Sequence, residues 1–295
     1  MKSLDSQPSG LAESVPTTTP FDGRRTIERQ GFSYLPQFIT KEESEQLLEY
    51  FSSVQPLWEQ RHTGEESERA SKHSRRLTRP VYWLGAWQFA CLGYYAEPNY
   101  RENRCVRAEP FPEVMQEILN RLQPLIKRDH QGAQGELSQD SPNTCLINYY
   151  GRETTNGIPR DYARLRMHRD GEIGPVVMFS LGQAGLLEFL DPERSPEPEL
   201  GVWTRHRSVS ILSGPEFKDR LYHRVSQVRT GELPIMSTSL PQFDLRRVSV
   251  SFRHVPEELI VDFADLPNER REKVRAYVAS LGEKSTHFRE QLLSE

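Results

Sequence analysis

The pattern of hydrophobic and polar positions divides the chain into a helix-patterned first half and a strand-patterned second half. After a strand-like run, "GFSYLPQFI", apolar residues recur at helical spacing, and Thr40 with Glu43 three residues later forms a capping box. A second amphipathic pattern follows Pro112 in "FPEVMQEILNRLQPLI". From residue 143 to 254 the pattern changes to short β-rich runs separated by turn residues, which is typical of an all-β barrel or sandwich.

These patterns predict one domain that is mainly β with flanking helices. Residues 1–22 are rich in Ser, Thr and Pro, and we expect them to form a disordered tail. Residues 23–142 form a helical N-terminal part and residues 143–256 form the β core. Residues 257–295 are patterned as polar C-terminal helices.

Composition narrows the class of protein. The 295 residues, 36% hydrophobic and 27% charged, are typical of a soluble globular chain. With a net charge of −4, any binding of nucleic acid has to come from local basic patches. We expect neither a signal peptide nor a membrane span, because no apolar run is long enough. Three cysteines without a C-x-x-C motif favour a reducing compartment, the cytoplasm or, in a eukaryote, also the nucleus. The sequence gives no indication of the oligomeric state.

The stretch "HRDGEIGP" carries two residue types that bind metals. A strand with a two-residue period places His168 and Asp170 on one face. One imidazole and one carboxylate are two of the three ligands in the facial triad of non-haem Fe(II) enzymes. The simpler interpretation is a turn with an incidental histidine.

Among the eight histidines, His223 is the favoured third ligand. It lies in the β-rich run "RLYHRV", whereas His206 in a turn and His254 after a strand are weaker candidates. The remaining histidines lie in polar connecting or helical segments. A histidine in a strand such as "RLYHRV" is otherwise a packed core residue.

The last β-rich run, "RVSVSFR", alternates polar and apolar residues. An ordinary half-buried strand turns its polar face to water, but two arginines six residues apart on one face suit a dicarboxylate. In "TCLINYY", Asn148 and Tyr150 share a face and can hydrogen-bond the same acid, although both types are also common as structural residues. The polar face of "RVSVSFR" comprises Arg247, Ser249, Ser251 and Arg253.

The order of these motifs resembles the AlkB family of Fe(II)- and 2-oxoglutarate-dependent dioxygenases. N-x-Y, H-x-D, a strand ending in S-L-G, "SGPEFKDRLYH" and R-x-S-x-S-F-R follow one another over residues 80–254. The resemblance implies a double-stranded β-helix, or jelly-roll, core. It also implies that His168, Asp170 and His223 hold Fe(II), with O2 and 2-oxoglutarate as cosubstrates.

The resemblance assigns further residues to 2-oxoglutarate. Arg247 and Tyr150 would hold the distal carboxylate, while Asn148 and Arg253 would lie near the chelating end. Ser249 stands where the family often has asparagine, and a serine hydroxyl donates a hydrogen bond with less reach.

The resemblance also implies a substrate, an alkylated nucleobase of DNA or RNA that is demethylated oxidatively, as in repair. Glu172 would face the base, although it is equally well a solvated turn acid. The segment "YWLGAWQFACLGYY" resembles the nucleotide-recognition segment of the family, which would extend the N-terminal part to this role. Trp87 and Tyr94 match the stacking aromatics best, with Trp83 as an alternative; such aromatics are otherwise core residues.

Two basic clusters are candidates for phosphate contacts, although charge runs are commonly just solvated faces. The first surrounds Arg79, which we expect to contact the substrate. The second runs into the H-x-D motif. The two clusters comprise Arg69, Lys72, Arg75, Arg76 and Arg79, and Arg160, Arg164, Arg166 and Arg169.

Two other functions stay open. Long segments containing "GRETTNGIPRDYARLRM" and "TGELPIMSTSLPQFD" depart from the simple family pattern and can reshape the substrate mouth. The chain would then be a 2-oxoglutarate-dependent hydroxylase of a small molecule or a protein side chain. The third function, a binding module without turnover, is disfavoured by the intact H-x-D…H set and the arginine pair.

Overall fold

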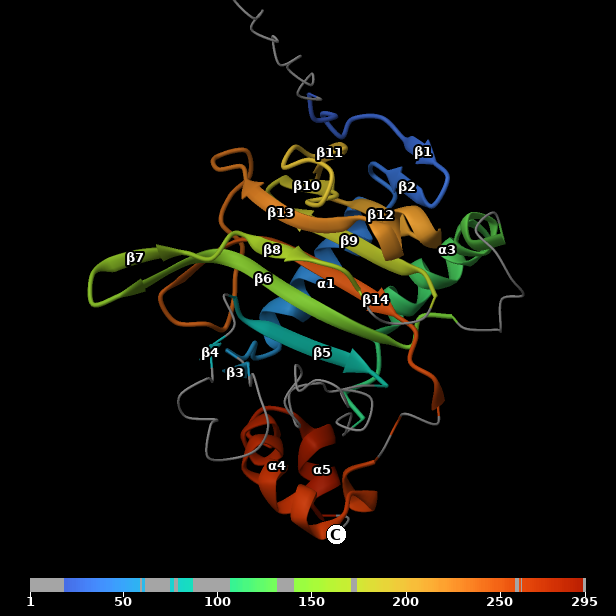
Figure 1. Cartoon of the computed structure of the whole chain (residues 1–295). Helices are drawn as coiled ribbons and strands as arrows, with labels where there is room; N and C mark the ends of the chain where they lie inside the picture. The colour runs from blue at the N-terminus through green and yellow to red at the C-terminus, as the bar shows by residue number, and fades with distance from the viewer. Residues whose placement is uncertain are drawn as a thin grey trace, which may run out of the picture.

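The computed structural model describes residues 19–58, 60–61, 75–76, 79–86, 107–131, 141–170, 174–257, 260 and 262–293. Two antiparallel sheets dominate it (Figure 1). The larger sheet has the order β1-β2-β12-β9-β14-β6-β5, with β7 paired to β6, and the smaller has the order β11-β10-β13-β8. A two-stranded ribbon, β3 with β4, lies apart from both.

The strands of the larger sheet come from distant parts of the sequence. Its central strands β12, β9, β14 and β6 follow residue 143, whereas β1, β2 and β5 precede it. The strands are β1 (Ile27–Arg29), β2 (Phe32–Leu35), β5 (Val81–Gly85), β6 (Thr144–Thr155), β7 (Ile158–Asp161), β9 (Val176–Gly182), β12 (Ser208–Leu212) and β14 (Phe243–Arg253).

The smaller sheet faces the inner side of the larger one and completes the barrel. It consists of β8 (Leu165–His168), β10 (Gly185–Leu190), β11 (Leu200–Thr204) and β13 (Tyr222–Val228). Of the eight strands β6 and β8 to β14, four lie in each sheet: β6, β9, β12 and β14 in the larger one, and β8, β10, β11 and β13 in the smaller one, which is the double-stranded β-helix. The predicted jelly-roll with flanking helices is confirmed. The ribbon strands are β3 (Gln60–Arg61) and β4 (Arg75–Arg76), and a six-residue π-helix η2 (Pro215–Arg220) precedes β13.

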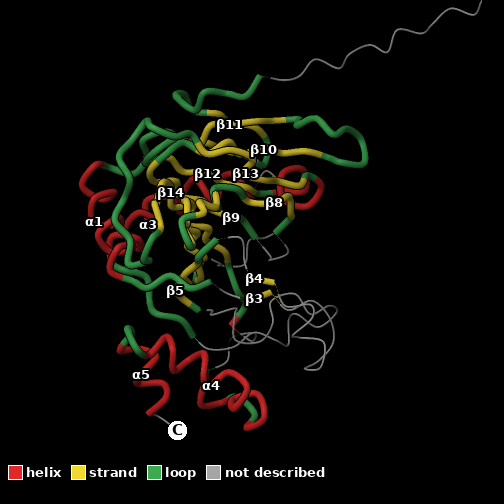
Figure 2. The backbone as a smooth tube through the Cα atoms, turned by 90° about the vertical axis from the view of Figure 1, so that its left-hand side faces the viewer, coloured by secondary structure: helices red, strands yellow, loops and turns green. Residues whose placement is uncertain are grey.

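Two helices cover the outer face of the larger sheet (Figure 2). They are α1 (Lys41–Ser53) and α3 (Glu113–Gln131). The capping box of α1 is confirmed: Thr40 Oγ1 accepts from the Glu43 amide at 3.1 Å, and Glu43 Oε2 accepts from the Thr40 amide at 2.8 Å. The apolar side of β14 packs into this layer through Val248, Val250 and Phe252.

The C-terminal helices α4 (Asn268–Gly282) and α5 (Thr286–Leu293) pack below β5, after the short 3-10 turn η4 (Phe263–Asp265) (Figure 1). Val278 and Phe288 are buried in a separate apolar cluster with Trp83 of β5. The predicted C-terminal helices are therefore present. Although they were patterned as polar, their few apolar residues are buried in this cluster. None of the described helices is long and apolar enough to cross a membrane.

Candidate metal centre

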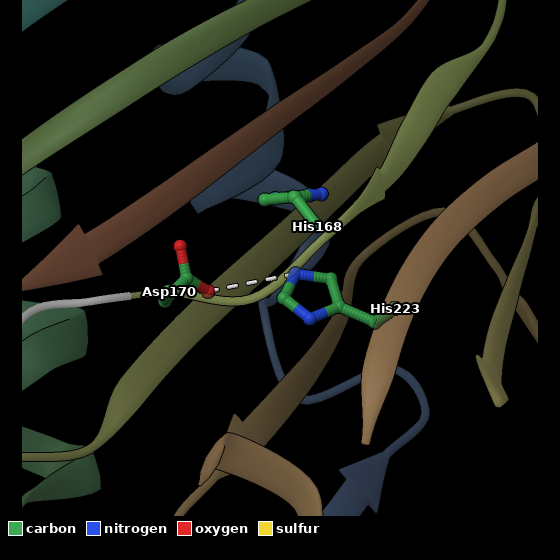
Figure 3. Close-up of side chains that lie close together, drawn as sticks. All are labelled: His168, Asp170 and His223. Carbon is green, nitrogen blue, oxygen red and sulfur yellow. Dashed lines mark ion pairs between the residues drawn. The ribbon is translucent and has the colours of Figure 1, made fainter. Parts of the chain in front are cut away.

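Three potential metal ligands meet between the two sheets. His168 is the last residue of β8, and His223 lies directly opposite it on β13, so the backbone register places the two imidazoles together. Asp170 follows β8 by two residues. One ligand atom from each side chain lies within 4.8 Å of the other two, and His223 Nε2 is 3.5 Å from Asp170 Oδ2 (Figure 3).

The protonation states of the three side chains suit a cation. Burial lowers the pKa of His223 to about 3 and also lowers the pKa of His168, so both imidazoles are neutral at pH 7. His168 Nδ1 lies 2.9 Å from the Arg166 carbonyl oxygen and donates to it, which leaves Nε2 as the free ligand atom. Two neutral imidazoles and one carboxylate are the donor set of a facial-triad Fe(II) site.

Arg253 fixes the carboxylate of Asp170. Its Nη2 and Nε donate to Asp170 Oδ1 at 2.5 and 3.2 Å, and both side chains are at most 7% exposed. Burial alone raises the pKa of Asp170, but Arg253 and the two histidines outweigh it and hold that pKa well below its usual range. Because Arg253 occupies Oδ1, Oδ2 is the oxygen directed at His223 and available to a metal ion.

The second arginine of β14 is also buried in the barrel and has no acidic partner among the described residues. Arg247 is 3% exposed, and its Nη2 donates to Ser180 Oγ at 2.9 Å and Thr204 Oγ1 at 3.2 Å. Its Nε and Nη1 are buried without a hydrogen-bond partner among the described residues. A buried guanidinium with two free donors fits one carboxylate of an elongated dicarboxylic acid.

Gly185 makes room for this guanidinium. A Cβ atom at residue 185 would lie 2.8 Å from Arg247 Nε and 3.1 Å from Cζ, which is closer than van der Waals contact. The hydroxyls of Ser180 and Thr204 hold the guanidinium in place, so it has little freedom to move aside. Glycine at the start of β10 is thus part of the arginine pocket.

The remaining side chains expected to contact 2-oxoglutarate also face the barrel interior. Asn148 and Tyr150 of β6 and Ser249 of β14 are at most 5% exposed. The Tyr150 ring centroid is 5.0 Å from Arg247 Cζ. The polar face of β14 therefore points inward rather than to water, as the dicarboxylate hypothesis required.

Arg79 lies elsewhere than predicted. The sequence predicts that it contacts substrate phosphates as part of a basic cluster, but it is 8% exposed, and its Nε donates to Asn148 Oδ1 at 2.6 Å. The predicted phosphate contact is therefore wrong, because the pairing of β5 with β6 places the side chain beside Asn148 in the barrel interior. The alternative stacking residue, Trp83, is 2% exposed against the C-terminal helices and cannot stack on a base.

Several predicted residues lie outside the described part of the chain. These are Trp87, Tyr94, Glu172, Arg69 and Lys72. Arg75 and Arg76 form β4. Neither weaker histidine candidate joins the triad: His206 Nδ1 accepts from the Gly182 amide, and His254 Nδ1 lies 3.1 Å from the Ser141 carbonyl oxygen.

The second basic cluster lies beside the triad. Arg160 on β7, Arg164 and Arg166 are exposed. Arg169 is exposed but partly engaged, because its Nη1 donates to the Asp219 carbonyl oxygen and its guanidinium covers the Tyr222 ring at 4.4 Å.

Sequence reasoning missed Ser180, Thr204 and Gly185. Ser180 carried a signal, since it precedes Leu-Gly on an alternating strand whose other face is apolar. The sequence contained no comparable sign for Thr204 or Gly185.

Comparison with known proteins places these motifs in a family. The model of the 2OG-Fe(II) oxygenase superfamily matches residues 31–253. A solved structure, "The structure of OsALKBH1", is similar with 18% sequence identity and a TM-score of 0.48, covering 78% of this chain and 99% of that chain. No curated protein is significantly similar. The sequence match to the family model, which spans both sheets and all three triad residues, carries the assignment.

Proposed function

Because the chain belongs to the 2OG-Fe(II) oxygenase superfamily, we propose that this Fe(II)- and 2-oxoglutarate-dependent dioxygenase is an AlkB-like oxidative demethylase of alkylated nucleobases in DNA or RNA. The observation that carries the choice of substrate is the position of the second basic cluster. Arg160, Arg164 and Arg166 are exposed on the segment that leads directly into His168. Guanidinium groups there can bind the phosphates that flank a base at the metal centre.

The roles of the site residues follow from their contacts. We assign Fe(II) to His168, Asp170 and His223, whose donor atoms and protonation states fit it. Arg253 keeps Asp170 ionised and oriented, because it occupies the carboxylate oxygen that faces away from His223. Arg247 takes the distal carboxylate of 2-oxoglutarate, because its two unpartnered donors are the buried polar atoms that such an anion satisfies.

The chemistry of the bound group determines the products. Iron with 2-oxoglutarate and O2 supplies the oxidative decarboxylation of the keto acid to succinate and CO2, coupled to hydroxylation of a substrate C–H bond. A hydroxymethyl group on a base nitrogen is then lost as formaldehyde. The protein binds and orients the reactants and excludes water. Its polar interior is shielded by strands on both sides, and hydrogen-bonding groups are presented to the cosubstrate by Asn148, Tyr150 and Ser249.

The test is product analysis with methylated oligonucleotides. The Fe(II)-loaded protein is incubated with 2-oxoglutarate, O2 and single-stranded oligonucleotides that each carry one N-methylated base. We expect formaldehyde and the unmodified base in equal amounts, with at least as much succinate, and none of the three with Asp170→Ala. Succinate formation without any demethylated base or formaldehyde, across DNA and RNA, would reject nucleic acid as substrate. That result would favour the alternative, a hydroxylase of a small molecule or protein side chain.

A further inference from the structure

A third arginine is buried in the interior of the barrel, in addition to Arg247 and Arg253. Arg79, just before β5, is only 8% exposed, and its Nε donates to Asn148 Oδ1 at 2.6 Å. Its Cζ lies 5.8 Å from the centroid of the Tyr150 ring. Arg79 therefore contacts the same two β6 side chains that face the cosubstrate.

Arg79 has no anionic partner among the described residues. Arg253 is paired with Asp170, and Arg247 is placed for the distal carboxylate of 2-oxoglutarate. The one hydrogen bond that the structure shows for Arg79 goes to a neutral amide. A buried guanidinium without a negative neighbour is energetically costly unless a ligand supplies the negative charge.

The cosubstrate does not supply a further negative charge for Arg79. Ferrous iron, Arg247 and Arg253 already carry more positive charge than Asp170 and a 2-oxoglutarate dianion carry negative charge. Arg79 adds to this surplus. Counted over the described residues, the loaded site is therefore electropositive in a region of low dielectric constant, where charge interactions are strong.

Arg79 also lies on the side where both sheets end. It precedes β5, an edge strand of the larger sheet, and His168 ends β8, an edge strand of the smaller sheet. Strands β5 and β8 lie on the same side of the barrel (Figure 1), and β8 ends at the metal ligand His168.

We propose that Arg79 determines the charge preference for the substrate: it favours a neutral or anionic target group beside the metal and disfavours a cationic alkylated base. Where it concerns nucleobases, this inference rests on the proposed demethylase function. A positive base next to a fixed guanidinium is repelled, whereas a neutral base of the same shape can accept a hydrogen bond from the Nη groups of Arg79.

The test compares two nearly isosteric bases, 3-methylcytosine, which is positively charged at pH 7, and 3-methyluracil, which is neutral. Wild-type protein should demethylate 3-methyluracil with the higher kcat/KM. The preference should fall on the order of tenfold in Arg79→Gln, because one charge is removed, and about a hundredfold in Arg79→Glu. Arg79→Lys should retain it. The ratio is measured within one preparation, so loss of folded protein affects both substrates equally.

A control isolates the effect of this arginine. Arg121 of α3 is a surface arginine paired with Glu43, so Arg121→Gln should leave the ratio at the wild-type value. An unchanged ratio in Arg79→Gln and Arg79→Glu would overturn the inference. So would a rise in the KM for 2-oxoglutarate without a change in the ratio, because Arg79 would then belong to the cosubstrate pocket.

A second measurement does not depend on nucleic acid. Benzoate and the benzamidinium cation have the same planar shape and opposite charge, and their inhibition of uncoupled succinate formation is measured at saturating 2-oxoglutarate. Stronger inhibition by benzoate than by benzamidinium, reversed in Arg79→Glu, supports the inference even if no oligonucleotide is a substrate. Equal inhibition by both, or inhibition by neither, contradicts it. Failure of the demethylase assay alone rejects the proposed function and not the charge preference.

Discussion

Replacing Arg247 with methionine should stabilise the ligand-free protein while removing its response to 2-oxoglutarate. Methionine has a similar length and no charge. In the wild-type protein, two buried guanidinium nitrogens have no partner among the described residues, and burial lowers the pKa of the group. The protein therefore holds an unfavourable charge in readiness for an anion.

The magnitude follows from the contacts of Arg247. Each unsatisfied buried donor costs about 1–3 kcal/mol, whereas loss of the bonds to Ser180 and Thr204 costs roughly 1 kcal/mol each. We expect Arg247→Met to raise the free energy of unfolding of the ligand-free protein by about 1–3 kcal/mol. For 2-oxoglutarate, removal of the charged partner of a buried carboxylate costs about 3–5 kcal/mol, or a loss of affinity of at least about a hundredfold.

The assay is chemical unfolding with and without 2-oxoglutarate, in the presence of Mn(II) under anaerobic conditions so that no turnover occurs. At about 100 times its Kd, the ligand should stabilise the wild-type protein by about 2.7 kcal/mol and the variant hardly at all. When ligand is added, the unfolding free energies of the two proteins should therefore become similar, or the wild type should become the more stable one. A variant that is less stable without ligand, and that still responds to 2-oxoglutarate like the wild type, would refute this reasoning.

Three further predictions test the surroundings of the site. Gly185→Ala should raise the KM for 2-oxoglutarate about tenfold, because its Cβ would displace the guanidinium, whereas Gly282→Ala, with ordinary contacts at 3.4 Å, should not change it. Without metal, His223 has a pKa of about 3 in the folded protein and 6.5 in the unfolded chain. Between these pH values, the unfolded chain binds a proton at His223 that the folded protein does not bind. Unfolding free energy measured against pH should therefore fall as the pH drops through this window, by about 2 kcal/mol at pH 5, and the fall should be smaller in His223→Gln. Oligonucleotide binding measured against salt should lose about one log–log unit of slope per arginine in a triple glutamine variant, and an unchanged slope would exclude phosphate contacts at Arg160, Arg164 and Arg166.

The metal triad could be predicted from sequence because its chemistry and its strand periodicity agree. His168 and Asp170 are spaced for one face of a strand, and His223 lies in a late apolar run. What brings His223 to them is the pairing of β13 with β8, and long-range pairing has no local signature in the sequence. The ordered motifs of the family supplied that information.

Arg79 shows where such reasoning fails. Its neighbours Arg75 and Arg76 are basic, so the local pattern indicated a solvated cluster. The pairing of β5 with β6 instead places Arg79 beside Asn148, within the barrel. Trp83 was misplaced for a related reason, because the C-terminal helices that cover it follow 185 residues later in the chain, at Asn268.

The most direct test of the central claim is metal-dependent turnover of 2-oxoglutarate by the purified chain. Fe(II) content and succinate release are measured together in the wild type, in His168→Ala, Asp170→Asn and His223→Ala, and in Arg121→Gln as a control remote from the site. We predict one Fe(II) per chain and succinate formation in the wild type and the control, and loss of both in the three triad variants. Stoichiometric iron and undiminished succinate release in Asp170→Asn and His223→Ala would contradict the assignment of this centre.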